Sequence, residues 1–213
     1  VTGVQVFRTT HQIGHILAAL YSAKKLEWIA QRQSFYAFHV SGGTTDMLLC
    51  EPCGGDELIK ITRVGGSSDL KAGQAIDRCG VMLGLRFPCG AELEKLAVQS
   101  EEKIRVKPVI KGCECSLSGI ENKCRALFES GADSSYIAAF CLRSVESAVA
   151  AVTCAAIAEH GELPVLYAGG VMSDKLIADS LRKKFGADFA APDFSCDNAA
   201  GMALYAALMK GLI

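Results

Sequence analysis

The chain has 213 residues, and half of them are hydrophobic, so it can build one large buried core. Its formal net charge of −1 excludes a strongly basic nucleic-acid-binding module. No apolar run reaches the ~20 residues of a membrane span, and residues 1–8 lack the pattern of a signal peptide. We therefore expect a cytoplasmic protein without a membrane contact.

The first predicted helix covers residues 11–25 and follows two threonines that can cap it. A short strand is predicted just before it, over residues 4–8. On the helix, His11 and His15 are four residues apart and therefore share one face. Two imidazoles at this spacing can bind one metal ion if a third ligand comes from elsewhere. The alternative is a pair of surface or half-buried histidines.

A hairpin is predicted over residues 38–49, with the turn at Ser41-Gly42-Gly43-Thr44. Glycine can take positive φ, and a tight turn of this kind can direct backbone N–H groups into an anion-binding concavity. The hydroxyl of Ser41 adds a donor. The motif is therefore typical of a phosphate-binding loop, whereas an ordinary hairpin turn is the alternative.

The later elements alternate between helices and strands. Helices are predicted over 72–83, 91–98, 116–130, 134–160, 174–185 and 197–209, and strands over 57–64, 104–109, 164–168 and 187–191. Residues 65–69 are predicted to form a loop. The strand that runs into Gly169-Gly170 and then a helix is typical of ligand binding in an open α/β sheet. This order predicts a mixed α/β domain.

Asp77 and Asp197 each lie at a position that suits either a structural role or ligand binding. Asp77 lies in the helix over 72–83, and with Gly90 it frames a helix–turn–helix. It can hydrogen-bond a ribose or be a solvated helix acid. Asp197 begins the last helix, where it either caps the helix or supplies the third metal ligand.

The ten cysteines are typical of buried thiols rather than of disulfides. Cys141, for example, lies in an apolar helical pattern, where cysteine acts as a small hydrophobic residue. Cys50-x-x-Cys53 and Cys113-x-Cys115 offer four thiols for zinc. Because these pairs differ in spacing and lie unusually far apart, we favour buried thiols over a zinc site.

Two glycine turns resemble those of the sugar-kinase/actin/heat-shock-chaperone ATPase superfamily, at residues 40–46 and 166–171. Within it, the chain resembles the tRNA threonylcarbamoyladenosine transferases, the TsaD/Gcp family formerly called O-sialoglycoprotein endopeptidases. The motifs occur in the family's order: His11-Gln12-Ile13-Gly14-His15, Val40-Ser41-Gly42-Gly43, residues 69–77, Phe87-Pro88-Cys89-Gly90, Ser116-Leu117-Ser118-Gly119-Ile120, Ala168-Gly169-Gly170-Val171 and Cys196-Asp197-Asn198.

The resemblance implies an actin-like fold, mainly its second lobe, with a β-meander and a βαβα unit. It implies transfer of threonylcarbamoyl from threonylcarbamoyl-adenylate to N6 of the adenosine next to the tRNA anticodon. It also implies one divalent ion, iron or zinc, held by His11, His15 and Asp197, and an ATP- or AMP-type nucleotide. The substrate and nucleotide contacts that it implies are His39, Val40, Ser41, Gly42, Gly43, Asp77, Gly90, Gly169, Gly170 and Asp174. Implied partners are tRNA and the family's partner proteins.

The chain departs from the family at several polar positions of this pocket. Where the family has a second acid, this chain has Leu70; where it has a lysine, this chain has Glu121; and where it has an asparagine, this chain has Asp174. These changes predict a divergent paralogue, either an enzyme or a non-catalytic protein that binds a nucleotide or a partner. A metalloglycoprotease is disfavoured, because Gln12 stands where the H-E-x-x-H motif has its glutamate base.

The family's first lobe, with another phosphate-loop hairpin, has no counterpart before the motif at residues 11–15. We divide the chain into residues 1–34, a remnant of that lobe, residues 35–195, the second lobe, and residues 196–213, a helix packing back on the remnant. Without one wall of the cleft, the chain is expected to be inactive alone. It is also expected to expose apolar surface that favours a homodimer.

Overall fold

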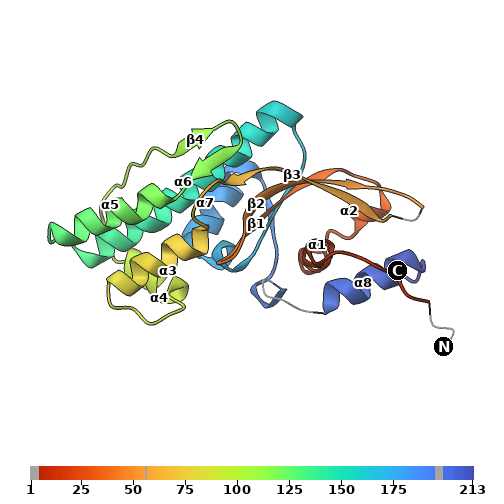
Figure 1. Cartoon of the computed structure of the whole chain (residues 1–213), viewed down its shortest axis with the longest axis horizontal. Coiled ribbons are helices and arrows are strands. Elements are labelled where there is room, and N and C mark those ends of the chain that lie inside the picture. The colour runs from red at the N-terminus through yellow and green to blue at the C-terminus, as the bar shows by residue number, and fades with distance from the viewer. Residues whose placement is uncertain (1–4, 56, 195–198) are drawn as a thin grey trace.

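The computed structural model describes residues 5–55, 57–194 and 199–213. A seven-stranded sheet lies at its centre, with helices on both faces (Figure 1). The strands are β1 (Phe35–Val40), β2 (Thr45–Pro52), β3 (Ile59–Ser67), β4 (Val109–Lys111), β5 (Glu114–Ser116), β6 (Val165–Ala168) and β7 (Asp188–Phe189). The α-helices are α1 (His11–Ser22), α2 (Glu27–Ala30), α3 (Ala72–Met82), α4 (Gly90–Ala97), α5 (Ser118–Glu129), α6 (Ser134–His160), α7 (Lys175–Phe185) and α8 (Ala200–Met209), with short 3-10 helices at Gly170–Ser173 and Pro192–Phe194.

The strands are arranged in the order β4-β5-β3-β2-β1-β6-β7. β1, β2 and β3 form an antiparallel meander. On one side of it, β6 lies parallel to β1 and β7 parallel to β6. On the other side, β5 pairs in parallel with β3, and β4 closes the edge. The mixed α/β prediction, with its meander and its later strand–helix–strand unit, is confirmed.

Alternate residues of β1 enter two separate cores, because successive side chains of a strand point to opposite faces. Tyr36, Phe38 and Val40 join the core that α3, α5, α6 and α7 cover. Phe35 and Ala37 join the core that α1 and α2 cover, to which α8 contributes Tyr205. The sheet is thus buried on both faces at β1, which explains the continuous apolar run of that strand.

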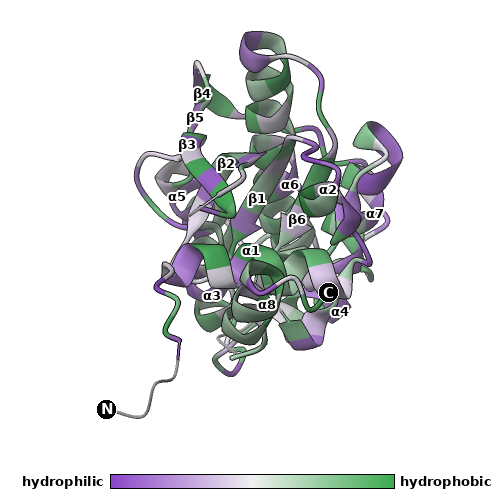
Figure 2. Ribbon diagram, turned by 90° about the vertical axis from the view of Figure 1, so that its right-hand side faces the viewer, coloured by the Kyte–Doolittle hydropathy of each residue, from purple (hydrophilic) through white to green (hydrophobic). Residues whose placement is uncertain are grey.

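Helix α6 is the central helix of the larger core and packs against α3, α4, α5 and α7. By length and composition it could cross a membrane, but 67% of its most apolar window is buried inside the protein. Figure 2 shows hydrophobic residues along much of this helix. Its apolar composition is therefore accounted for by its place in the core.

Several predicted strand bounds are wrong. Residues 5–10 form no strand, and the edge strand is Val109–Lys111 rather than residues 104–109. The expected loop at 65–69 is largely strand, since β3 continues through Ser67. A Cβ at Gly65 would overlap the carbonyl oxygen of Cys113. The glycine therefore lets the chain leading into β5 approach β3 closely, and the ladder continues where glycine suggested a loop.

The two cysteine pairs cannot form one zinc site. Cys50 is buried in the core beneath α1, whereas Cys113 and Cys115 are buried in the core on the other face of the sheet. The sheet itself separates these thiols. The expectation of buried thiols is confirmed for Cys50, Cys113 and Cys115, whereas Cys53 is half-buried.

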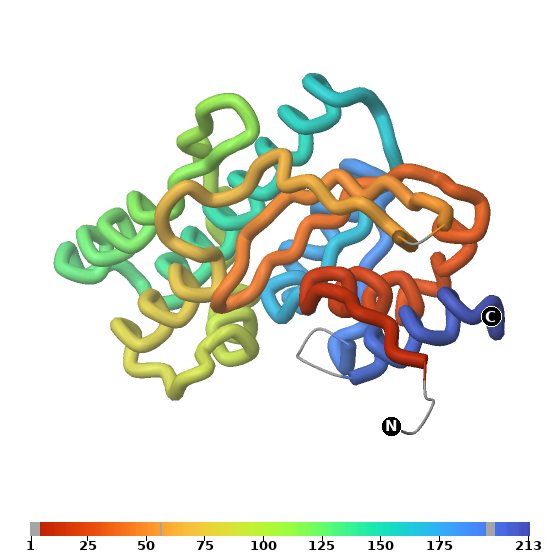
Figure 3. Tube along the Cα trace, turned by 45° about the vertical axis from the view of Figure 1, so that its right-hand side comes forward, coloured from red at the N-terminus to blue at the C-terminus, as the bar shows by residue number. Residues whose placement is uncertain are grey.

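Helices α1 and α8 come from opposite ends of the chain and lie side by side (Figure 3). Their contact is made at two glycines, because a Cβ at Gly201 would overlap the carbonyl oxygen of Gly14. In the described chain helix α8 covers Ala200–Met209, and the predicted start of this helix at residue 197 lies outside the described residues. The division of the chain at residues 34 and 195 stays a prediction.

Candidate functional site

Three of the four histidines of the chain gather between α1 and the end of β1. Nε2 of His11 lies 2.9 Å from Nε2 of His15. The ring centroids of His15 and His39 are 4.9 Å apart. His39 reaches α1 because it follows Phe35 and Ala37 on the same face of β1. The sequence placed His39 among the nucleotide contacts and missed that it lies beside the histidine pair, although this alternation could have shown it.

The histidine pair fits a metal ion. Two nitrogens bound at about 2.1 Å lie about 3.0 Å apart at the angle of about 90° of an octahedral ion and about 3.4 Å apart at a tetrahedral ion, so the 2.9 Å between the two Nε2 atoms fits the octahedral case. His11 is exposed and His15 is half-buried, so an ion can reach both rings. The third predicted ligand, Asp197, lies outside the described residues. Helix α8 begins three residues later and touches α1 at Gly14, which lies between the two histidines in the sequence.

The turn between β1 and β2 concentrates backbone donors. The N–H groups of Gly43 and Thr44 donate to Oγ of Ser41, at 3.3 and 3.1 Å. Neither Gly42 nor Gly43 takes positive φ in the described chain, contrary to the expectation from their sequence. The serine hydroxyl instead occupies the point on which these N–H groups converge, where a ligand oxygen could replace it.

The first turn of α3 holds this loop in place. The N–H of Gly73 donates to the carbonyl oxygen of Ser41 at 3.1 Å, and the N–H of Ala72 donates to Oγ1 of Thr45 at 2.9 Å. A Cβ at Gly73 would lie 2.7 Å from Cα of Gly42. The positive end of the helix dipole is therefore held against the loop, which favours a bound anion.

The second glycine turn lies against the first. Gly169 has φ +99°, and a Cβ there would overlap the carbonyl oxygen of Val40. β1 and β6 are parallel, with His39 opposite Ala168, so both strands end at the same edge of the sheet. The structure thus brings together the histidines, the Ser41 loop and the Gly169–Gly170 turn.

Asp77 lies four residues after Gly73, which contacts the loop, and therefore about 6 Å further along α3. Its Oδ1 accepts a hydrogen bond from the N–H of Cys89 at 2.8 Å, which ties α3 to the start of α4 at Gly90. Asp77 also lines a surface hollow of about 540 Å³, together with the exposed Phe87 and Val81. The acid therefore has a structural contact and borders a space large enough for a ring system.

Asp174 is buried at the N-terminus of α7. Its Oδ1 accepts from the N–H of Ile177 at 3.0 Å, while Oδ2 has no hydrogen-bond partner in the described chain. Burial, together with the nearby Glu94 carboxylate, raises the pKa of Asp174 to about 6. Glu94 is itself fixed, since it accepts from the N–H of Lys175 at 3.0 Å. The sequence did not indicate this pairing of two acids.

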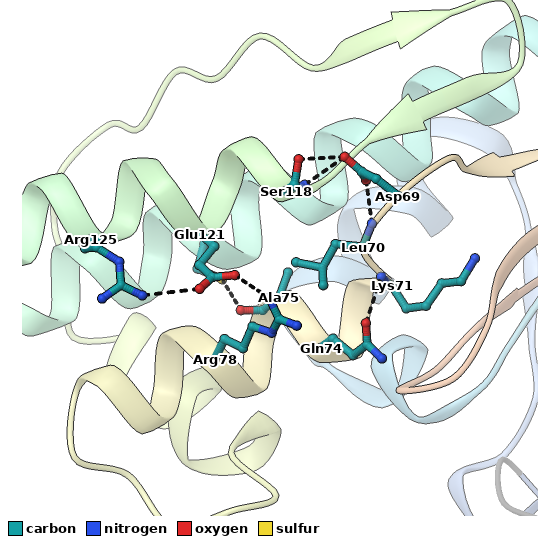
Figure 4. Close-up of polar contacts among 10 residues, drawn as sticks. Asp69, Leu70, Lys71, Gln74, Ala75, Arg78, Ser118, Glu121 and Arg125 are labelled. Atoms are coloured by element: carbon teal, nitrogen blue, oxygen red, sulfur yellow. Dashed lines mark hydrogen bonds and ion pairs between the residues drawn. The ribbon is translucent and has the colours of Figure 1, made fainter.

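Sequence reasoning also missed the role of Asp69. Its carboxylate accepts from the hydroxyl of Ser118 at 2.6 Å and from the N–H of Leu70 at 2.6 Å (Figure 4). It also accepts from the hydroxyl of Ser116 at 2.7 Å and from the N–H of Leu117 at 2.8 Å. Burial raises the pKa of Asp69, but the hydrogen bonds outweigh it and hold the pKa well below its usual range. This acid joins the end of β3 to the start of α5, an association that no local pattern indicates.

Two of the departures from the family have structural roles. Leu70 is buried and belongs to the larger core. Glu121 accepts from Arg78 at 2.7 Å and from Arg125 at 3.3 Å, as Figure 4 shows. The hydrogen bond to Arg78 is the main cause that lowers the pKa of Glu121. These side chains are thus engaged with the protein itself.

Comparison with known proteins decides the family. Residues 4–204 match the TsaD family, described as tRNA N6-adenosine threonylcarbamoyltransferase. The chain belongs to this family. The TsaD-family enzyme of Thermococcus gammatolerans is 30% identical over 175 residues, which are 80% of this chain and 52% of that protein. An enzyme of the same name from Thermus thermophilus is 31% identical over 176 residues, 81% of this chain and 53% of that protein. The chain therefore spans about half the length of the curated TsaD relatives it matches.

Solved structures show the fold. Full-length HypF, in a phosphate- and nucleotide-bound form, matches with a TM-score of 0.72 at 15% identity, over 96% of this chain and 42% of HypF. Component A of the (R)-2-hydroxyglutaryl-CoA dehydratase of Acidaminococcus fermentans matches with a TM-score of 0.56 at 17% identity, over 92% of this chain and 67% of that one. The actin-like ATPase fold expected for this TsaD-family chain is confirmed.

Proposed function

We propose that this chain is the metal- and acyl-adenylate-binding half of a tRNA N6-adenosine threonylcarbamoyltransferase. The observation that supports this best is that His15 and His39 lie with ring centroids 4.9 Å apart, beside the Ser41 loop. A metal-type histidine pair and an anion-type loop therefore share one edge of the sheet. The proposed reaction is that of the family. The proposed location is the cytoplasm, because tRNA is found there.

The proposed ligand set is His11 and His15 with Asp197. A divalent ion bound there, iron or zinc, would polarise the carbonyl of the threonylcarbamoyl donor. Support for Asp197 is the backbone contact between Gly14 and Gly201, since it holds the start of α8 against the turn that carries both histidines.

The Ser41 loop would bind the phosphate or acyl oxygens of the donor. In this proposal the Ser41 hydroxyl turns away and leaves the N–H groups of Gly43 and Thr44 to the ligand. The N-terminus of α3 adds a favourable field for negative charge. Asp77, with Gly90 across the turn, would face the nucleoside, and Gly169, Gly170 and Asp174 would border it from β6 and α7.

The proposal is tested by calorimetry of this chain with AMP and with a stable analogue of threonylcarbamoyl-adenylate. A Cβ at Gly43 meets no atom within 4 Å, so Gly43→Val should fold normally while its side chain fills the loop. We expect the variant to unfold at the wild-type temperature and to bind the analogue at least tenfold more weakly. Gly119→Ala, which also meets open space, is the matched control. Equal binding by Gly43→Val and wild type would contradict the proposal.

A second candidate is a non-catalytic paralogue that binds a nucleotide and a partner protein. It is favoured by the buried Leu70 and by the ion pairs of Glu121, because both side chains differ from those of the family and are engaged here with the protein itself. The two candidates differ in turnover. Transfer to unmodified tRNA by the full-length gene product supports the enzyme, whereas nucleotide binding without transfer supports the paralogue.

A further inference from the structure

Three cysteines from three different helices converge in the larger core. Cys79 comes from α3, Cys124 from α5 and Cys141 from α6. Their sulfur atoms all lie within 4.8 Å of one another. The side chains are 1%, 0% and 0% exposed, and all three are free thiols. The cluster is distinct from the histidine site, which lies on the other face of the sheet.

The spacing of these sulfurs fits one enclosed ion. Three sulfurs bound at about 2.3 Å around a trigonal ion lie about 4 Å apart, within the spacing found here. Among the described residues, this group contains three ligand side chains. A structural zinc site requires four ligands, and this buried position leaves no exposed place for water. Soft ions that accept two or three thiolates, Cu(I) above all, have no such requirement.

The outer wall of the cluster carries compensating charge. Glu121 lies one helical turn before Cys124 and bonds both Arg78 and Arg125, so this surface group has a net charge of +1 (Figure 4). These three side chains also line part of the hollow of about 540 Å³ that Asp77 borders, and none of the three cysteines lines it.

We propose that Cys79, Cys124 and Cys141 form a binding site for a soft, thiophilic metal ion, with Cu(I) as its physiological example. On binding, each S–H bond that breaks releases its proton to solvent, and the sulfur bonds the ion. The copper enters and stays as Cu(I), so no oxidant or reductant takes part. The site is independent of the proposed transferase function.

The test is an anaerobic titration of the reduced 213-residue chain with Cu(I) against a competing chromogenic chelator. We expect wild type to keep one equivalent of Cu(I), and Cys124→Ser to lose it. Cys154→Ser and Cys113→Ser should keep it, because Cys154 is exposed and Cys113 lies outside the cluster. X-ray absorption at the copper edge should show sulfur ligands without nitrogen.

Where Cys124→Ser fails to fold, Cys79→Ala replaces it, since alanine adds no polar group to the core. Circular dichroism melting of the metal-free variants checks the fold. Retention of Cu(I) by the folded cluster variant would overturn the proposal. So would nitrogen ligands at copper, or loss of the ion in His15→Ala.

Discussion

Gly14 in α1 and Gly201 in α8 touch backbone to backbone, so closely that a Cβ at Gly201 would overlap the carbonyl oxygen of Gly14. Gly201 therefore has a physical reason, because it lets α8 cross directly beside the turn that carries His11 and His15. A side chain at Gly201 would push the helices apart, whereas a Cβ at Gly14 would meet only the flexible end of the Met202 side chain. This contact holds the two ends of the described chain together at the site.

The first prediction concerns this helix crossing. Gly201→Ala should lower the free energy of unfolding by about 1–3 kcal/mol, because the added methyl group forces the helices apart. The same variant should retain less metal, since the start of α8 moves away from α1. Urea denaturation and metal analysis measure the two effects. Gly119→Ala, in open space, should show neither, and a wild-type result for Gly201→Ala would refute the close packing.

The second prediction concerns Asp174. Its pKa of about 6 in the folded protein exceeds the ordinary 3.8, so the folded state holds this proton more tightly than the unfolded state. The stability due to this group is therefore complete below pH 3.8 and is lost as the pH rises through about 6. Asp174→Asn keeps the helix cap and removes the charge. At pH 8 it should be more stable than wild type by about 1–3 kcal/mol.

Urea denaturation at pH 4 and at pH 8 checks this prediction. The gain from Asp174→Asn should appear at pH 8 and be small at pH 4. Asp174→Ala is the matched control, because it also removes the charge but loses the cap to Ile177, at a cost of about 1 kcal/mol. A gain of equal size at both pH values would show that the buried charge is not its cause.

The third prediction concerns Asp69. Asp69→Asn should destabilise the protein, because losing a hydrogen bond to a charged group typically costs about 1.5 kcal/mol or more. The pKa of Asp69 is lowered by folding, so its contribution is present above the ordinary value of 3.8 and is lost as the pH falls toward the folded value. The acid limb of the stability profile should be less steep in the variant. Thermal melts between pH 2 and pH 7 measure it, and an unchanged limb would contradict the argument.

Local patterns predicted most of the elements. The helix over residues 134–160 has the expected bounds, because its apolar period is regular and Gly161 ends it. The strand over 104–109 was misplaced because the true edge strand is three residues long and depends on pairing with β5. Short strands of this kind are set by tertiary contacts rather than by their own sequence.

The site was predicted only in part, because part of it depends on tertiary contacts. The motifs identified the Ser41 loop and Gly169, and their meeting follows from parallel strands ending at one edge. In the Asp69 network, the serine partners lie 47 and 49 positions after Asp69 in the sequence. The three clustered cysteines come from three different helices. Contacts of this kind need the packed structure, since no spacing along the chain indicates them.

The central claim is that His11 and His15 hold one metal ion together. Metal analysis of the purified chain, loaded with Fe(II) or Zn(II) and then desalted, tests it most directly. We predict about one ion per chain in wild type and at least a tenfold loss in His15→Ala. We predict full retention in His160→Ala, because His160 is the one histidine that does not lie between α1 and the end of β1. Equal metal content in His15→Ala and wild type would contradict the account.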